Sequence, residues 1–345
     1  MRACESGMAA GDLAMNVPKE LIEHLLAWRK VVVVGHVTPD ADCLGAMIAL
    51  AQGFAGPGRR DLRVALPPDS LSKRLAFMIE QARPALAEPR DFDEADGFVA
   101  LDTAKISRCN VGPEVRSTWV DGKVLLNIDH HASNTRFGRV NWVEPTAGST
   151  SEMVFRLLDA AGQPVTPLTA SLLYAGILTD SVGFTLGNTT PGALETAAEL
   201  VARGADVAAL GEQLYRSLTP AEFQLLQTIY GNTRIVADGR LAYSTADYDE
   251  ITRAGCTAAD IDDQVNVPRS VRGIRMALLL TEGVRGRTRI NFRGESGLNV
   301  LDLAKAMGGG GHAEAAGTIL DLPLKEAVPQ VLAQATDYLN ARGNG

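Results

Sequence analysis

Cysteine is scarce in this chain and a net positive charge is missing, and each absence argues against a class of protein. The four cysteines are scattered and form no C-x-x-C pair, which argues against a disulfide framework and against a zinc knuckle. The formal net charge is -8, whereas a protein that wraps long nucleic acid usually carries a basic face. This charge leaves room for a small anionic ligand that is held by a local site.

Long apolar runs are also missing. No run is long enough to span a bilayer, and residues 1–16 contain Glu5 and Asp12 in place of the apolar segment of a secretory signal. We therefore predict a cytoplasmic protein with reduced thiols, without a membrane partner, and with a disordered tail over residues 1–16.

The remaining sequence has the composition of an ordinary globular protein. Its 345 residues are 46% hydrophobic and 21% charged, which is enough apolar material for two cores. Short apolar runs alternate with helical patterns in the first part, as is typical of a parallel α/β sheet. We assign these runs to residues 31–34, 62–66, 97–101 and 124–128. Shorter strand patterns after residue 231 predict a second, smaller α/β domain.

The pattern gives the following domain prediction. We expect a catalytic domain over residues 17–203, a linker over 204–219 and a smaller domain over 220–345. Helical patterns continue through the range that we assign to the linker.

Three of the four predicted strands in the first domain end in polar residues. His36 follows the first strand, Asp102 the third, and Asp129-His130-His131 the fourth. Because ligands bind beyond the carboxyl ends of strands in an open α/β sheet, we expect these side chains to converge. Imidazole and carboxylate together are typical ligands of a divalent transition metal such as manganese.

Most of these residues also have a purely structural interpretation. In His36-x-x-x-Asp40-x-Asp42, the Pro-Asp pair could start a turn and Asp42 could cap the following helix. Asp102 could be a helix N-cap, and Asp180 could end a helix. The aspartate-histidine-histidine triplet is harder to explain in this way, because two adjacent imidazoles at a strand end are rarely packing residues.

Taken together, the candidate ligands are two histidines and four aspartates, with His131 in addition. They are His36, Asp40, Asp42, Asp102, His130 and Asp180. Two ions about 3.5–4 Å apart that share a carboxylate are a recurrent solution to phosphoryl transfer. The set therefore predicts metal-assisted cleavage of a phosphate ester.

A glycine motif near the end of the chain suggests a second site. Gly308, Gly309, Gly310 and Gly311 precede His312 and a small-residue segment that we expect to be helical. Glycine allows the backbone to approach a ligand closely, so that N–H groups can point at a phosphate. A flexible turn is the alternative interpretation.

In this order, the motifs resemble those of the DHH phosphoesterases, a family named for the triplet that stands here as Asp129-His130-His131. The His-x-x-x-Asp-x-Asp motif, Asp102, the triplet and Asp180 match the four motifs of the family. The glycine motif with Ala315-Ala316-Gly317 resembles that of the DHH-associated domain. The resemblance covers nearly the whole chain after the tail. It implies an α/β fold, with an N-terminal DHH domain whose mainly parallel sheet is flanked by helices, and a smaller C-terminal α/β DHH-associated domain.

The resemblance also implies roles for the site residues. Two manganese ions per chain would be held by two sets of ligands: His36, Asp40 and Asp102 for one ion, and Asp42, Asp102, His130 and Asp180 for the other. Asp102 would bridge the ions, Asp129 would orient a ligand, and His131 would contact the scissile phosphate or help to protonate the leaving oxygen. Magnesium and cobalt are alternative metals.

Within the family, the short two-domain form resembles the NrnA-type enzymes, which degrade very short RNAs and in many cases dephosphorylate 3'-phosphoadenosine-5'-phosphate (PAP). The segments 129–134 and 184–191 are similar to theirs, and Arg293 matches their phosphate-binding arginine. Gly294 departs from the serine that the family usually has there. The resemblance implies that the substrate is held by Asn134, Arg293, Gly309, Gly310, Gly311 and His312.

We therefore predict a metal-dependent phosphoesterase that hydrolyses short RNA or DNA oligonucleotides to mononucleotides. Nucleoside bisphosphates such as PAP, together with pApA and cyclic di-AMP, are further candidate substrates, and the family makes a homodimer plausible. Three alternatives stay open: a RecJ-like single-strand exonuclease, a family II inorganic pyrophosphatase and a non-catalytic nucleotide-binding module. A RecJ-like exonuclease would need further nucleic-acid-binding domains. The C-terminal domain of family II pyrophosphatases lacks the glycine motif that this chain has. Loss of a metal ligand would support the non-catalytic module.

Overall fold

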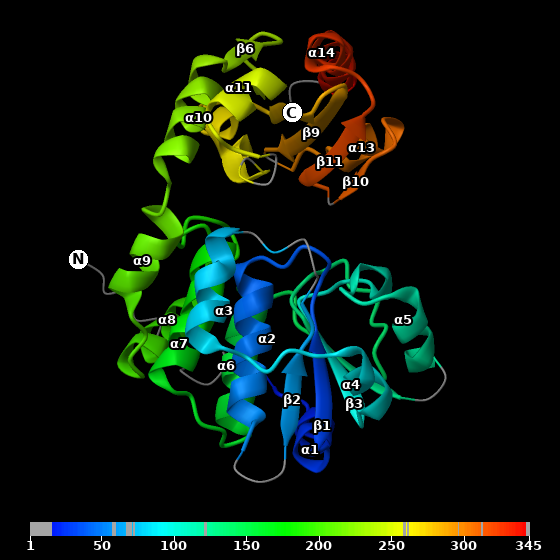
Figure 1. Cartoon of the computed structure of the whole chain (residues 1–345), viewed down its shortest axis with the longest axis vertical. Helices are drawn as coiled ribbons and strands as arrows, with labels where there is room; N and C mark the ends of the chain where they lie inside the picture. The colour runs from blue at the N-terminus through cyan, green and yellow to red at the C-terminus, as the bar shows by residue number, and fades with distance from the viewer. Residues whose placement is uncertain are drawn as a thin grey trace, which may run out of the picture. The chain divides into compact units, whose positions relative to one another are not determined.

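A computed structural model of the chain describes residues 16–56, 60–66, 71, 73–120, 123–257, 260, 262–295, 297–311 and 313–342. The chain divides into two compact units, residues 1–217 and residues 218–345 (Figure 1). The tail that we predicted over residues 1–16 lies outside the described residues except for Asn16. Among the described residues, no helix combines the length and apolar character that crossing a membrane requires.

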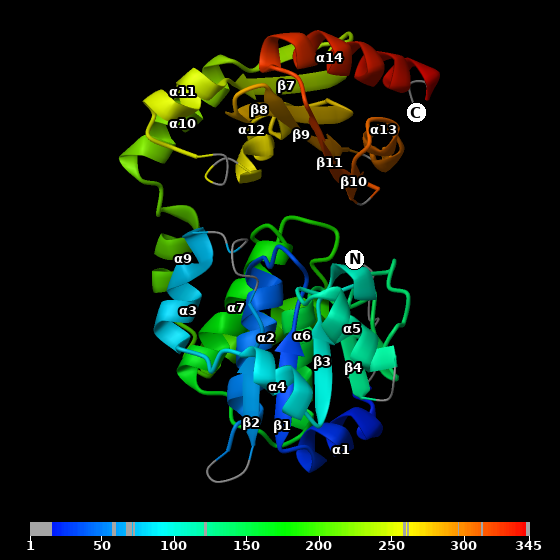
Figure 2. The ribbon, with the colours of Figure 1, turned by 45° about the vertical axis from the view of Figure 1, so that its right-hand side comes forward.

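The first unit is built around a five-stranded sheet in which every strand is parallel to its neighbours (Figure 2). Its order is β2-β1-β3-β4-β5. The strands are β1 (Lys30–Val34), β2 (Asp61–Val64), β3 (Gly97–Leu101), β4 (Val124–Asp129) and β5 (Val140–Val143). The three central strands β1, β3 and β4 are buried over most of their length, which explains why they consist largely of apolar residues.

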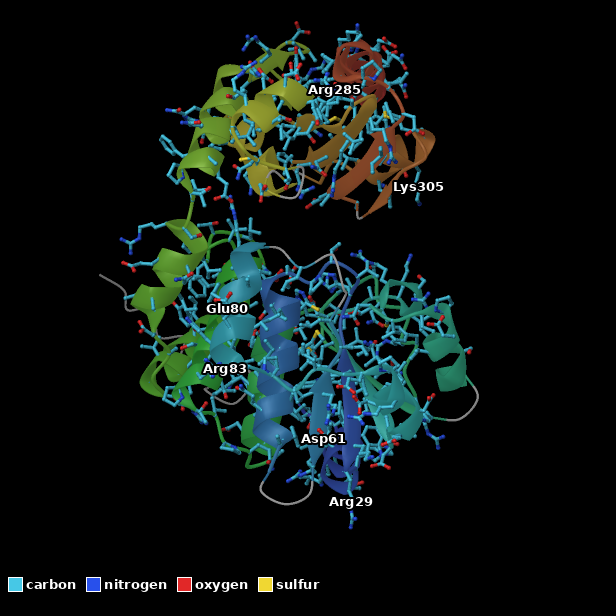
Figure 3. The ribbon with its side chains drawn as sticks, viewed as in Figure 1. Arg29, Asp61, Glu80, Arg83, Arg285 and Lys305 are labelled. Atoms are coloured by element: carbon cyan, nitrogen blue, oxygen red, sulfur yellow. The ribbon has the colours of Figure 1, made fainter. Side chains whose placement is uncertain are left out.

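Helices pack on both faces of this sheet. One face carries the larger core, to which the following helices contribute: α1 (Lys19–Ala27), α2 (Ala41–Phe54), α3 (Ala76–Ala82), α6 (Thr150–Ala160), α7 (Pro167–Asp180), α8 (Pro191–Ala202) and α9 (Val207–Tyr215). The other face carries a smaller core with α4 (Pro89–Glu94) and α5 (Pro113–Val120). Charged side chains such as Arg29 and Glu80 lie at the surface (Figure 3).

The second unit has a six-stranded sheet of order β10-β11-β9-β8-β7-β6, in which only β7 and β8 are parallel. The strands are β6 (Arg234–Val236), β7 (Leu241–Ala246), β8 (Met276–Val284), β9 (Arg287–Gly294), β10 (Gly310–Gly311) and β11 (Ala315–Leu320). One face packs against α13 (Leu301–Ala306) and α14 (Leu324–Ala341). The other face packs against α10 (Pro220–Gly231), α11 (Tyr248–Arg253) and α12 (Asn266–Arg269).

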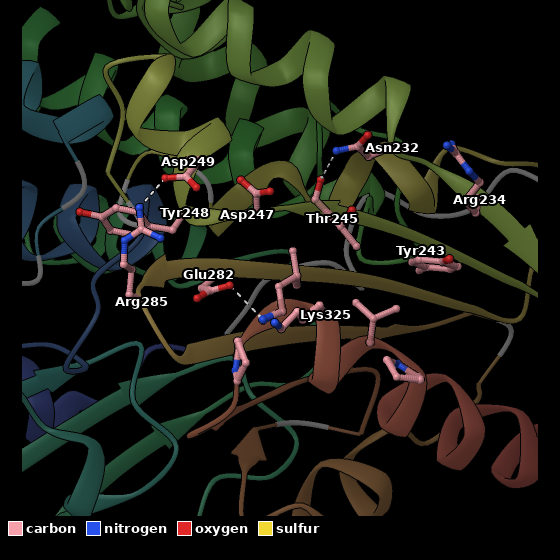
Figure 4. Close-up of a pocket in the computed structure, with 14 residues that line it drawn as sticks. Asn232, Arg234, Tyr243, Thr245, Asp247, Tyr248, Asp249, Glu282, Arg285 and Lys325 are labelled. Carbon is pink, nitrogen blue, oxygen red and sulfur yellow. Dashed lines mark hydrogen bonds and ion pairs between the residues drawn. The ribbon is translucent and has the colours of Figure 1, made fainter.

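A pocket of about 670 Å³ opens in the second unit near the start of α14 (Figure 4). Its lining includes Tyr243 from β7, Arg285 from the β8–β9 hairpin and Lys325 from α14. Arg285 is paired with Asp249 at 2.5 Å, and its guanidinium lies 4.4 Å from the centre of the Tyr248 ring. The pocket therefore mixes aromatic surface with charges of both signs.

The predicted fold class is confirmed, with one correction in the glycine motif. We expected residues 315–317 to begin a helix, but they lie in β11, which pairs antiparallel with β9 and with β10. Strand β5 and the short helices α4 and α5 were not predicted. The range that we assigned to the linker contains α9, whose Leu210 is buried in the larger core of the first unit.

Candidate metal centre

The candidate ligands of the first unit gather at the carboxyl ends of its central strands. In doubly wound sheets of this strand order, ligands bind where the order reverses, which here is between β1 and β3. His36 follows β1, Asp102 follows β3, and His130 follows β4. The topology therefore brings together residues that are far apart in the sequence.

The loop after β1 places three of these side chains. The backbone N–H of Val37 donates to the carbonyl of Arg108 at 2.9 Å, which fixes the loop beside the segment after β3. Asp40 caps α2, because its Oδ1 accepts the N–H of Cys43 at 3.0 Å. Our structural alternative had given this cap to Asp42, and that assignment is wrong.

Asp42 instead lies in the first turn of α2, where it is 1% exposed. Each of its carboxylate oxygens accepts one backbone N–H from the start of α6, donated by Thr150 and Ser151 at 2.8 Å. Gly176 of α7 makes room for this contact, since a Cβ there would lie 2.7 Å from Asp42 Oδ1 and 2.0 Å from Ser151 Oγ. The Asp42 carboxylate is therefore fixed by backbone donors and by a close helix approach.

Asp102 lies at the centre of the cluster. Its Oδ2 is 3.6 Å from His36 Nε2, and its Oδ1 is 3.7 Å from His130 Nε2 and 3.6 Å from His131 Nδ1. The Thr150 hydroxyl donates to Oδ1 at 3.0 Å. Asp102 has a φ of 53°, a left-handed conformation that aspartate tolerates better than most residues and that recurs at functional sites.

The remaining candidates lie beside Asp102. Asp180, the last residue of α7, has its Oδ2 3.8 Å from His130 Nε2. Asp40 Oδ2 is 4.0 Å from His36 Nε2, although the Asp40 side chain is 61% exposed. The first unit thus brings its predicted metal ligands into one region.

Charge crowding at this site perturbs several protonation equilibria. Burial raises the pKa of Asp42 well above its usual value, and the neighbouring carboxylates of Asp102 and Asp180 add to the shift. Burial, followed by the repulsion of Asp102, raises the pKa of Asp180 to about 6, although the nearby His130 opposes the shift. Burial would also raise the pKa of Asp102, but the adjacent imidazoles of His36, His130 and His131 hold it well below its ordinary range. A bound cation would relieve the repulsion among these carboxylates.

His131 belongs to a hydrogen-bond network beneath the cluster. Its Nδ1 lies 2.7 Å from Asp129 Oδ1, and the other oxygen of Asp129 accepts a hydrogen bond from Asn134 at 2.6 Å. Burial lowers the pKa of His131, but the Asp129 contact outweighs it and raises the pKa to about 9. Asn134 also donates to Asn127 at 2.8 Å. We predicted Asn134 as a substrate contact, and the structure places its amide in this network.

The donor atoms fit a divalent cation. Three sets of donors lie within 4.8 Å of one another: Asp102, His130 and His131; Asp42, His130 and Asp180; and His36, Cys43 and Asp102. The His36 and His130 contacts to the carboxylates, at 3.6–4.0 Å, are too long for hydrogen bonds. Two ligands that each lie about 2.1 Å from one ion can be separated by up to about 4 Å.

The predicted substrate contacts of the second unit lie near one edge of its sheet. Arg293 of β9 is half-buried, and its Nη1 donates to the carbonyl of Phe292 at 3.0 Å. A Cβ at Gly294 would lie 2.0 Å from the carbonyl oxygen of Leu298, so the departure from serine there has a steric cause.

The glycine motif forms part of this sheet edge. A Cβ at Gly309 would lie 2.2 Å from the carbonyl oxygen of Gly317, so packing requires glycine there. Gly310 and Gly311 form the exposed strand β10. His312 lies outside the described residues.

Several residues that shape the site were not predicted to do so. Asn127 is fully buried, and its signal is a polar residue inside the apolar strand β4. Ser149 is the N-cap of α6, and the hydroxyl of the next residue, Thr150, contacts Asp102. The sequence signal for Gly176 is that it is a glycine inside an otherwise apolar helix. Asn188, whose amide donates to Asp180 Oδ2 at 2.8 Å, gives no local signal of this role.

Each of the two units matches one domain of a known family. Residues 30–177 match the N-terminal domain of the DHH family, and residues 238–341 match the DHHA1 domain. The matched ranges contain every predicted metal ligand except Asp180, which follows three residues after the first range.

Individual relatives and a solved structure are similar over nearly the whole chain. The bifunctional oligoribonuclease and PAP phosphatase NrnA of Thermus thermophilus is 33% identical over 314 residues, which are 91% of this chain and 91% of the relative. The enzyme of the same name from Bacillus subtilis is 27% identical over 304 residues, covering 86% of this chain and 91% of that enzyme. The crystal structure of an exopolyphosphatase-related protein from Bacteroides fragilis has a TM-score of 0.84 at 24% identity, covering 94% of this chain and 98% of that one. This last similarity concerns the fold alone.

Proposed function

The chain belongs to the DHH family of metal-dependent phosphoesterases, and from this premise we propose that it hydrolyses short oligonucleotides to mononucleotides. The observation that carries the proposal is the position of Asp102, whose carboxylate lies within 3.7 Å of nitrogen atoms of His36, His130 and His131. The similarity to relatives named as oligoribonuclease and PAP phosphatase supports the substrate class, and PAP is therefore a second candidate substrate.

We propose that the cluster holds two manganese ions, with magnesium and cobalt as alternative metals. His36, Asp40 and Asp102 would hold one ion, and the second would be held by Asp42, Asp102, His130 and Asp180. When bound, such ions lower the pKa of a water molecule and offset negative charge on the phosphoryl oxygens. Imidazole ligands favour manganese over magnesium, which prefers oxygen ligands.

The protein's own groups would orient the reacting phosphate. Asp129 and Asn134 hold the His131 ring in a fixed orientation, from which it would contact the scissile phosphate or protonate the leaving oxygen. Thr150 holds one oxygen of Asp102 and leaves the other facing His36. These fixed positions support catalysis because little reorganisation is needed at the moment of reaction.

The second unit would bind a more distant phosphate of the substrate. Arg293 supplies a guanidinium, and Gly310 and Gly311 expose backbone to which His312 is adjacent in the sequence. A fork of guanidinium N–H groups gives bidentate, charge-assisted hydrogen bonds to a phosphate. The cytoplasmic location and the homodimer stay predictions from the sequence.

A substrate panel tests the proposal. Purified chain with manganese would be offered RNA and DNA of two to five nucleotides, long single strands, PAP, pApA, cyclic di-AMP and pyrophosphate. We expect the fastest turnover on the short oligonucleotides, with mononucleotide as product. Preference for long single strands would favour the RecJ-like alternative, and preference for pyrophosphate would favour the pyrophosphatase. Binding of nucleotides without turnover would favour the non-catalytic alternative.

A further inference from the structure

Asn188 joins two parts of the metal centre through its side-chain amide. Its Nδ2 donates to Asp180 Oδ2 at 2.8 Å and to the carbonyl oxygen of Gly148 at 2.9 Å. The same oxygen of Asp180 lies 3.8 Å from His130 Nε2. The amide therefore connects the end of α7, which carries Asp180, to the segment that leads into α6.

Residues 181–187 form a tight loop that brings Asn188 back to Asp180. The Ser181 hydroxyl accepts the N–H of Phe184 at 3.0 Å, and the Ser181 carbonyl accepts the N–H of Thr185 at 2.9 Å. Val182 has a φ of 48°, which is rare for a β-branched residue. Such conformations cost about 1–3 kcal/mol each and cluster at functional sites. The loop thus maintains an unfavourable backbone while placing Asn188 beside the carboxylate.

The Asp180 carboxylate is held by one donor, which comes from a side chain and not from the backbone. Asp42 is held by two backbone N–H groups, and Asp102 is held by the Thr150 hydroxyl. Among the described residues, Asn188 is the only group that donates a hydrogen bond to the Asp180 carboxylate. The Asp180 side chain is 27% exposed and lies near other carboxylates, so without this donor it can rotate toward solvent.

We propose that Asn188 is a positioning residue that orients the Asp180 carboxylate toward the donor group formed with Asp42 and His130. The inference rests on the proposed function, because it takes Asp42, His130 and Asp180 to hold a divalent ion. Partners that orient a metal ligand typically change metal affinity by about 10–100-fold when they are removed. Loss of the Asn188 donor should therefore weaken one of the two ion sites and spare the other.

Calorimetric titration of the metal-stripped full chain with Mn²⁺ tests this inference. Asn188→Leu keeps nearly the same side-chain volume but removes the donor, and we expect one binding event to weaken by about 10–100-fold. Asn188→His retains an N–H donor near the same position and should restore most of that affinity. Asn188→Ala removes the same donor and gives the equivalent test if Asn188→Leu does not fold.

Asn232 of the second unit provides a matched control. Its Nδ2 also donates to one backbone carbonyl, that of Thr245 at 3.1 Å, and to one carboxylate oxygen, that of Glu250 at 3.0 Å. Asn232→Leu should lower the Tm of the metal-free chain about as much as Asn188→Leu does, but leave Mn²⁺ binding unchanged. Wild-type Mn²⁺ affinity in Asn188→Leu, or an equal loss in Asn232→Leu, would overturn the inference.

The same titration separates this inference from the proposed function, because it is read without substrate. A wild-type chain that binds Mn²⁺ but cleaves no oligonucleotide would contradict the proposed function and leave the role of Asn188 intact. A chain that cleaves oligonucleotides but binds Mn²⁺ equally well with and without the Asn188 amide would contradict only the inference.

Discussion

Substituting Asp102 tests whether one carboxylate serves both ions. Asp102→Asn is preferable to alanine, because residue 102 has a φ of 53°, which asparagine tolerates, whereas alanine would add about 1–2 kcal/mol of backbone strain. Asparagine also preserves the side-chain volume at a position that is only 4% exposed. The substitution therefore removes the negative charge with little other change.

The expected loss follows from the position of Asp102. Its two oxygens face different histidines, Oδ2 toward His36 and Oδ1 toward His130. Removal of a residue that only orients a ligand weakens metal affinity by about 10–100-fold, so loss of a ligand shared by two ions should cost at least that factor at each site. We expect two weakened Mn²⁺ binding events and turnover below detection at metal concentrations that saturate the wild type.

Mn²⁺ titration and single-turnover hydrolysis of an RNA dinucleotide are the assays. Asp206→Asn is the matched control, because Asp206 is a helix N-cap in the same unit. Among the residues that the structure describes, its side chain accepts only a local N–H, that of Ala209 at 3.0 Å. Weakening of a single binding event in Asp102→Asn would refute the bridging role. Near-wild-type turnover would refute the two-metal assignment as a whole.

Three further predictions concern the substrate. His131→Ala should lower the rate while both ions stay bound, because we place this ring on the phosphate; metal analysis that shows one ion lost per chain would move His131 into the ligand set. Rates on RNA at saturating metal should fall steeply beyond a few nucleotides, because a net charge of -8 disfavours binding of a longer strand. Equal rates on a pentamer and a long strand would contradict this. Arg293→Ala should raise KM on oligonucleotides by about 10–100-fold, since a charge-assisted hydrogen bond is worth about 1.5–3 kcal/mol and about 1.4 kcal/mol is a factor of ten. Arg293→Ala should affect hydrolysis of bis-p-nitrophenyl phosphate much less, and Arg289→Ala on the same strand is the control. An equal loss of activity on both substrates would show that Arg293 is no separate phosphate contact.

The sequence predicts elements well where a local pattern decides the structure. The buried strands β1, β3 and β4 are almost continuous apolar runs, and the polar residues that follow them made His36, Asp102 and His130 recognisable as candidate ligands. Strand β5 was missed because it is a four-residue edge strand with an alternating pattern. Residues 315–317 are small and carry no clear periodicity, so their pairing with β9, and not local propensity, makes them a strand.

In the candidate site, too, some residues could be predicted from local sequence and others could not. Its candidate ligands could be predicted because each lies at or beside one end of a recognisable strand or helix. The residues that hold those ligands could not, because their contacts join segments far apart in the chain. Thr150 reaches Asp102 across 48 positions, and the N–H of Ser151 reaches Asp42 across 109. A threonine beside a helix cap carries no local sign of such a contact.

The central claim is that this site is a metal-dependent phosphodiesterase centre for short RNA, and one measurement tests it most directly. The metal-stripped chain would be titrated with Mn²⁺ while hydrolysis of an RNA dinucleotide is followed by release of mononucleotide. We predict no hydrolysis without metal, and activity that saturates when about two ions are bound per chain. Hydrolysis at full rate without added metal, or none at any Mn²⁺ concentration that fills the site, would contradict the claim.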